Sequence, residues 1–301
     1  MNSLPFGKSG KWFRGNLHTH STGSDGRKTP AQVCSLYRRR GYDFISLTDH
    51  FLEGYGWQVT DSTPYRCDGF TTIIGAELHA PKTELGGTWH ILAVGLPKNF
   101  PATGKRETGP QLAGRAARAG AYIATAHPAW YDLTDRDVLS IKSANAIEIY
   151  NTTCNQHNGK GDSVGYLDRL LSKGHRYHGI ATDDAHFQSD RPDHCQNWVM
   201  VRSNRLEPES LLSALHAGRF YSSQGPEIHH VKIDRRRKKV NVRTSPIRAI
   251  QMSGRGAGAA YHIARSDVTS VQLDLNRVQG YARVTVIDKR GRRAWTNPFW
   301  L

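Results

Sequence analysis

The sequence predicts an α/β fold, because short β-branched or aromatic runs alternate with helical patterns over roughly residues 12–202. Most of these runs also end at or just before a histidine or an acidic residue. In β/α barrels, the carboxyl ends of the strands carry the active site. The pattern changes after Gly225-Pro226, where short alternating runs joined by charged links indicate a small antiparallel β appendage. We therefore expect two domains, residues 1–225 and 226–301.

Composition indicates a globular protein with a sizeable core. The chain has 301 residues, 38% of them hydrophobic, which is enough for one large domain with a small addition. It contains no apolar run of signal-peptide length at its start and no run long enough to span a membrane. The four cysteines are scattered, which argues against a disulfide framework or a zinc knuckle. We expect a cytoplasmic protein with no membrane association.

The formal net charge of +15 indicates anionic partners. Two basic runs, at residues 38–40 and 235–239, contribute strongly to this charge. Because no aromatic residues are interleaved with them, nucleic-acid binding is possible but not favoured. A small anionic substrate is the preferred partner.

The first strand ends in a pair of histidines. In extended backbone, side chains at i and i+2 point to the same side, so His18 and His20 can reach one metal ion. The following loop, with Asp25-Gly26, can bring a carboxylate back toward both imidazoles. Imidazole and carboxylate together are typical ligands of Zn, Mn and Fe. Taken alone, the pair is equally consistent with two surface histidines.

The remaining elements follow from local signals. Thr29-Pro30 predicts a helix start and Gly41 its end. Further helices are expected at residues 111–119, 163–172 and 207–217. Strands are expected at residues 43–47, 71–75, 89–95, 121–126, 146–150, 178–182 and 198–202, and in the appendage at 231–234, 240–242, 247–252, 270–275 and 282–288.

The strand ends supply more metal ligands than one ion can use. They offer six imidazoles and three carboxylates, which indicates two or three divalent ions bridged by a carboxylate. The nine candidate ligands are His18, His20, Asp25, His50, Glu77, His90, His127, Asp184 and His186. The other histidines are interpreted as structural residues: His79, His157, His175, His178, His194, His216, His229, His230 and His262.

Two neighbouring carboxylates compete for one ligand position. Either Asp183 or Asp184 could bind the ion, and the i, i+2 spacing from Asp184 to His186 favours Asp184. Asp183 would then orient the ligands from behind.

Several of these motifs resemble the PHP (polymerase and histidinol phosphatase) family. Residues 16–26 and 41–50 resemble its opening motifs, and Glu77, residues 126–128 and residues 184–186 are similar to its later metal motifs. The resemblance covers roughly residues 12–225. It implies a distorted seven-stranded (β/α) barrel and a site for two or three Mn, Zn or Fe ions that hydrolyses phosphoesters. It assigns the nine candidate ligands to that site.

A weaker resemblance concerns the substrate. Residues 147–151 and 292–298 look closer to the carbaryl-hydrolase-like branch of metallohydrolases. This resemblance implies that a carbamate or amide bond is an alternative to a phosphoester.

The leading functional hypothesis is a metal-dependent phosphoesterase acting on a mono- or diester through a metal-bridging hydroxide. His127 or His186 would assist proton transfer, and Arg27 and Lys28 would grip the phosphate. The alternatives are a carbamate or amide hydrolase with the same ions, a nucleic-acid-processing or nucleic-acid-binding protein, and an inactive relic. No ligand position holds an inert residue. The sequence fixes neither the metal, the leaving group, the oligomeric state nor the role of the appendage.

Overall fold

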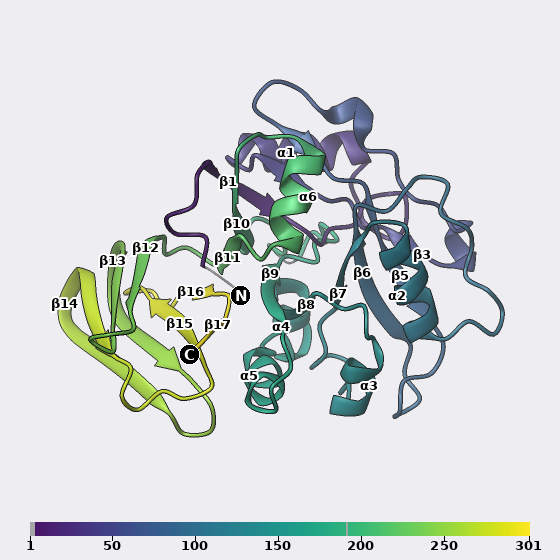
Figure 1. The fold of residues 1–301 in the computed structure, drawn as a ribbon. Helices are drawn as coiled ribbons and strands as arrows, with labels where there is room; N and C mark the ends of the chain where they lie inside the picture. Colours follow the sequence, from purple (N-terminus) through teal and green to yellow (C-terminus); the bar gives the residue numbers. More distant parts are fainter. Residues whose placement is uncertain (1–3, 191) are drawn as a thin grey trace.

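The computed structural model describes residues 4–190 and 192–301, which form a mixed α/β fold built on two sheets (Figure 1). The smaller sheet has six strands. Its strands, in spatial order, are β3 (His50–Phe51), β5 (Gly75–Ala80), β6 (Trp89–Val94), β7 (Tyr122–Thr125), β8 (Ala146–Asn151) and β9 (His178–Thr182). All neighbours pair in parallel except that β6 runs antiparallel to both β5 and β7.

The larger sheet has eleven strands and continues from the α/β part into the C-terminal region. Its order of neighbouring strands begins in the C-terminal region and ends with two short strands. The first of these pairs in parallel with β1, and the second pairs in parallel with the first. In spatial order these are β12 (Ile228–Asp234), β13 (Lys239–Ser253), β15 (Tyr281–Ile287), β16 (Arg293–Thr296), β11 (Phe220–Ser223), β10 (Trp198–Ser203), β1 (Lys11–Asn16), β2 (Phe44–Ile45) and β4 (Thr71–Thr72). Off this path, β14 (Ala259–Asp274) pairs with β13 and β17 (Phe299–Trp300) with β15.

The expected seven-stranded barrel does not close. Where closure would require β9 to pair with the chain after β1, the structure has only an isolated bridge between Thr19 and Ala185. Two backbone hydrogen bonds flank this bridge, from the His20 N–H to the Ala185 carbonyl and from the Asp184 N–H to the His18 carbonyl, both 2.9 Å long. The ladder stops because both segments turn here into the loops that carry the candidate ligands.

The helices begin and end largely where the sequence predicts. The N-cap hydroxyl of α1 (Pro30–Arg39) is that of Thr29, which forms a capping box with Gln32, so the predicted start is confirmed. The remaining helices are α2 (Gly109–Arg118), α3 (Asp135–Ser140), α4 (Thr152–Asn158), α5 (Val164–Ser172) and α6 (Pro208–His216), with 3₁₀ turns at Glu53–Tyr55 and Thr63–Tyr65. The sequence analysis did not predict α3 or α4.

The C-terminal strands are longer than the sequence predicts. Strands β13 and β14 have 15 and 16 residues, whereas only short runs were expected. Their pairing shifts register between Arg243 and Ile247 and again before Ala249, which breaks the alternation that a sequence pattern would show. Figure 1 shows β12 to β17 gathered beside the α/β part.

The two regions meet through a strand ladder and a partly buried ion pair. Strand β16 pairs with β11, with Tyr221 opposite Thr296. The guanidinium of Arg283, on β15, is buried and binds the carboxylate of Asp168, on α5, through Nε at 3.0 Å and a terminal nitrogen at 2.7 Å. None of the described helices is both long and apolar enough to cross a membrane.

Candidate metal centre

All nine candidate ligands come together in the structure. They form four overlapping groups of donor atoms, and within each group the atoms lie within 4.8 Å of one another. The parallel strands bring their carboxyl ends to one edge. Strand β6 brings its first residues to the same edge because it runs antiparallel to β5. This explains how His90, near the start of its strand, reaches the site.

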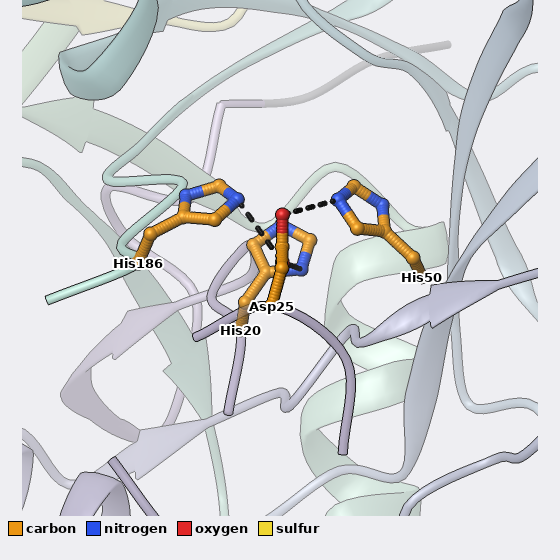
Figure 2. Close-up of side chains that lie close together, drawn as sticks. All are labelled: His20, Asp25, His50 and His186. Carbon is orange, nitrogen blue, oxygen red and sulfur yellow. Dashed lines mark ion pairs between the residues drawn. The ribbon is translucent and has the colours of Figure 1, made fainter. Parts of the chain in front are cut away.

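One group lies where the loop after β1 meets two strand ends (Figure 2). The carboxylate of Asp25 lies between His50 and His186, 3.4 Å from the Nε2 atom of each, and 3.8 Å from Nδ1 of His20. The Asp25 side chain is 41% exposed, so this group opens toward solvent.

The fully buried carboxylate of Glu77 lies at the centre of the cluster. Its Oε1 atom is 2.8 Å from Nδ1 of His90 and 3.2 Å from Nε2 of His127. Its Oε2 atom is 2.7 Å from Nδ1 of His50 and 3.6 Å from Nε2 of His79. Each oxygen therefore faces its own set of imidazoles, which is the arrangement of a carboxylate that bridges two ions.

His79 belongs to this cluster although the sequence analysis treated it as a structural histidine. Its Nε2 atom lies 2.8 Å from Nδ1 of His50, and its backbone pairs with His90 across β5 and β6. The signal was present in the spacing, because Glu77 and His79 stand at i and i+2 of one strand, as His18 and His20 do.

The two adjacent aspartates point to different surroundings. The Asp184 Oδ1 atom lies 2.9 Å from Nε2 of His20 and 3.1 Å from Nε2 of His18, inside the cluster. Asp183 instead accepts a 2.7 Å hydrogen bond from the Tyr37 hydroxyl. It also accepts bonds from three consecutive backbone N–H groups, of residues 195, 196 and 197. Asp183 anchors the loop after β9, and Asp184 faces the imidazoles.

The backbone at Asp184 is held in the left-handed region, with φ of 55°. Asparagine and aspartate tolerate this conformation better than other residues with a Cβ atom, but it remains uncommon. Such conformations persist where the surrounding structure over-determines them, and they concentrate at functional sites.

Glu148 supports the cluster from behind. Its Oε1 atom is 2.8 Å from Nδ1 of His18, and its Oε2 atom accepts a 2.6 Å hydrogen bond from the backbone N–H of His127. The Asn151 side-chain amide donates hydrogen bonds to Oε2 of Glu148 at 3.0 Å and to Oδ2 of Asp184 at 3.1 Å. A carboxylate bound to the far nitrogen of a histidine fixes the ring orientation for metal binding. No ligand-spacing signal distinguishes Glu148 in the sequence.

Buried polar atoms in the centre are left without hydrogen bonds. Among the described residues, Nε2 of His18, Oε2 of Glu77 and Nδ1 of His127 make no contact with hydrogen-bond geometry, although Asp184 and His50 lie within 3.1 Å of the first two. Buried polar atoms are nearly always satisfied, so orphaned atoms need an explanation. For His18 and Glu77, a bound ion would supply the missing partner, and the mixed imidazole and carboxylate donors suit Zn, Mn or Fe.

The histidines of the cluster differ in the direction in which their surroundings shift the pKa. Burial lowers the pKa of His20 to about 4, helped by His186 and His50, and burial lowers that of His90 to about 3. At His50, burial is outweighed by the carboxylates of Glu77 and Asp25, which raise the pKa to about 10. Neutral imidazoles bind metal, so His20 and His90 are ready to bind at neutral pH.

The carboxylates stay ionised despite their burial. Burial alone would raise the pKa of Glu77, but His90, His50 and His18 hold it well below its usual value. Burial would likewise raise the pKa of Asp184, and His18 and His20 lower it instead. The centre therefore keeps negative charge available for divalent cations.

A cavity of about 330 Å³ opens onto this cluster. Its lining includes several candidate ligands together with Trp130, Tyr131 and the helix α4 residues Thr153 and His157. Its volume is at the small end of ligand pockets, which suits a substrate of modest size.

The two proposed phosphate-gripping residues do not line this cavity. The Arg27 side chain is exposed, and its backbone N–H donates to the His186 carbonyl at 2.9 Å. The Lys28 ammonium lies 5.9 Å from the centre of the Phe187 ring. Within residues 4–190 and 192–301, the cavity wall includes neither arginine nor lysine.

Comparison with solved structures places the fold. Over 95% of this chain and 92% of the other, the structure is similar to a two-domain protein from Bacteroides vulgatus containing a predicted PHP-like metal-dependent phosphoesterase, with a TM-score of 0.55 and 15% identity. The two chains share a fold. An amidohydrolase from Chromobacterium violaceum, solved with sulfate and no metal, is more distant: TM-score 0.44 and 15% identity over 57% of this chain and 87% of that chain. No family model and no curated protein matches the sequence.

Proposed function

We propose that this protein is a metal-dependent phosphoesterase of PHP type. The observation that carries the proposal is the buried Glu77 carboxylate, whose two oxygens face separate sets of imidazoles at 2.7 to 3.6 Å. Two-metal sites of this kind suit ester hydrolysis, because the bound ions lower the pKa of water, polarise the ester and neutralise charge on the attacking and leaving oxygens.

The candidate ligands divide into three sets, each of which would bind one ion. His18, His20 and Asp184 would hold one ion together with Glu77. His90 and His127, which both face Oε1 of Glu77, would hold a second ion. Asp25, His50 and His186, drawn in Figure 2, would hold a third, at the edge where the Asp25 side chain is exposed. His79 adds a further imidazole beside His50.

Proton transfer to the leaving group is proposed for His127 or His186. Both imidazoles line the cavity, so either is near a bound ester. An imidazole nitrogen that holds an ion has no proton to give, so the acid would be whichever of these two rings leaves its ion to the remaining ligands of its group. Arg27 and Lys28 remain proposed phosphate contacts, which require the loop after Asp25 to bring them toward the cavity.

A carbamate or amide hydrolase is the second candidate. Its support is the cavity wall, where Trp130 and Tyr131 supply aromatic surface and the described residues supply no arginine or lysine. A neutral aryl carbamate would fit such a wall as well as an anionic ester. This candidate would use the same ligands.

The test compares two chromogenic substrates on the same preparation. We expect faster hydrolysis of an aryl phosphodiester than of the matching aryl carbamate, loss of both activities after chelation, and recovery on adding Mn²⁺ or Zn²⁺. Full phosphodiesterase activity in metal-stripped protein would refute the proposal. A faster carbamate reaction would establish the second candidate instead.

A further inference from the structure

A second cavity lies where the α/β part meets the C-terminal strands, and no step of the proposed reaction uses it. Its volume is about 290 Å³. Residues 290–293, from the turn between β15 and β16, form one side. Asn155 on α4 lies on another side, and Gln224, directly after β11, also lines the cavity. Apart from Tyr150 and Gly291, every lining side chain is polar or basic. This composition suits a charged ligand rather than an apolar one.

Three guanidinium groups line this cavity. Arg292 contacts a single oxygen of Asp288, Oδ2, with both Nε and a terminal nitrogen, each at 2.8 Å. Arg293 contacts Asp162 at 2.9 Å. An arginine carries five N–H donors, so each pair leaves donors for a ligand. Arg290 has an exposed side chain, and its backbone N–H bonds to Asp288. Neither Asp288 nor Asp162 lines the cavity.

Gly225 makes room for Arg292. A Cβ atom at this position would lie 2.5 Å from Cζ and 2.6 Å from Nε of Arg292, closer than any stable contact. The guanidinium therefore packs against bare backbone and is held by Asp288 from a second direction. Donors fixed in advance lose little conformational freedom when a ligand binds.

The charge distribution favours an anion at this end of the molecule. Residues 226–301 contain 16 of the 41 lysines and arginines but only five of the 26 acidic residues. Such a local excess of positive charge raises the concentration of anions near the surface and speeds their binding.

We propose that this cavity binds the phosphate group of a small anionic molecule, at a site separate from the metal centre. Arginine binds phosphate through paired, directional N–H bonds, and Arg290 and Arg292 supply them here. Helix α4 forms a wall common to both cavities: Asn155 lines the new site, and Cys154 and His157 line the metal pocket. The proposal does not depend on which bond the metal centre cleaves.

The test is calorimetric titration of the full-length, metal-loaded protein with inorganic phosphate at low ionic strength. We expect two classes of phosphate site, one at each cavity. In the double variant Arg290→Ala/Arg292→Ala, one class should weaken by at least about tenfold, as expected for loss of two charge-assisted contacts. Esterase activity and metal content should stay unchanged. Gly225→Ala should weaken the same class by displacing Arg292.

The matched control is Arg236→Ala/Arg237→Ala, which removes the same charge from the exposed turn between β12 and β13 and should leave both classes intact. Phenylphosphonate, which has no ester bond for the proposed enzyme to cleave, should bind the wild type at this class of site and lose that binding in the Arg290/Arg292 variant, as expected of a site for an organic phosphate group. Two unchanged classes in the Arg290/Arg292 variant would overturn the proposal. Absent esterase activity with phosphate binding retained would refute only the proposed hydrolysis.

Discussion

The carboxylate of Asp49 holds Ser21 by both of its oxygens. Oδ1 accepts the Ser21 backbone N–H at 2.6 Å, and Oδ2 accepts the Ser21 hydroxyl at 2.7 Å. The same buried carboxylate accepts the hydroxyls of Ser24 and Thr60, at 2.9 and 2.6 Å. Asp49 thereby fixes the loop that presents Asp25 to His50 and His186.

We predict that Asp49→Ala releases this loop. The backbone N–H of Ser21 would lose its buried acceptor, and the free energy of unfolding should fall by about 2 to 3 kcal/mol. The variant should also lose the ion nearest Asp25, which elemental analysis measures. Thr60→Ala removes one contact to the same carboxylate and should have a smaller effect on both quantities. An unchanged metal content in Asp49→Ala would contradict the positioning role.

Glu77→Gln tests the bridging carboxylate. Glutamine keeps the size of the side chain but removes the charge that two ions would share. We expect at least one fewer ion per chain and a fall in hydrolysis of more than about 100-fold, beyond the loss typical of a residue that only supports a ligand. Glu53→Gln, in the exposed turn at Glu53–Tyr55, is the matched control and should leave both measurements unchanged. Normal metal content in Glu77→Gln would remove the main support for the proposed function.

We predict that His178, which lies outside the metal centre, makes the free energy of unfolding depend on pH. Burial lowers its pKa to about 4, with a smaller effect from His216, and its Nδ1 atom lies 3.1 Å from the Tyr122 hydroxyl. Because the unfolded chain binds this proton near pH 6.5 and the folded chain does not, stability is lost as the pH falls from about 6.5 to 4. The loss should approach about 3 kcal/mol.

His178→Gln isolates this contribution. Urea unfolding at pH 7 and pH 4.5 should show a smaller pH-dependent loss of stability in the variant than in the wild type. Equal losses in the two proteins would show that His178 does not titrate as its burial requires. Because other histidines also titrate in this range, the difference between the two proteins is the quantity to compare.

The ion pair between buried Arg283 and partly buried Asp168 should stabilise the packing of the C-terminal strands against α5. Arg283→Ala leaves part of the Asp168 carboxylate without its partner, and Asp168→Asn leaves a buried guanidinium uncompensated. We expect each change to lower the free energy of unfolding by about 3 kcal/mol, and the double variant to lose much less than the sum. The exposed pair Arg248 and Asp267 is the control, with an expected effect below about 1 kcal/mol. Additive losses at Arg283 and Asp168 would contradict coupling.

Local chemistry allowed much of the site to be predicted from sequence. The i, i+2 spacing of His18 and His20 places both side chains on one side of extended backbone, whatever the rest of the chain does. The alternation of β-branched or aromatic runs with helical patterns predicted the α/β fold, and Thr29 before Pro30 predicted the first helix. These signals depend on neighbours within a few residues, so the sequence alone determines them.

Only the tertiary structure decided the remainder. His79 joined the ligands because β6 pairs antiparallel to β5 and places His90 across from it, a pairing that no local pattern records. The spacing to His186 favoured Asp184 over Asp183 but left both open, and the structure shows Asp183 bound by Tyr37 and by the backbone of residues 195–197, from distant parts of the chain. The barrel stayed open because the segments at Thr19 and Ala185 leave their ladder to build the site. Each outcome depends on long-range contacts, and these form only when the whole chain has folded.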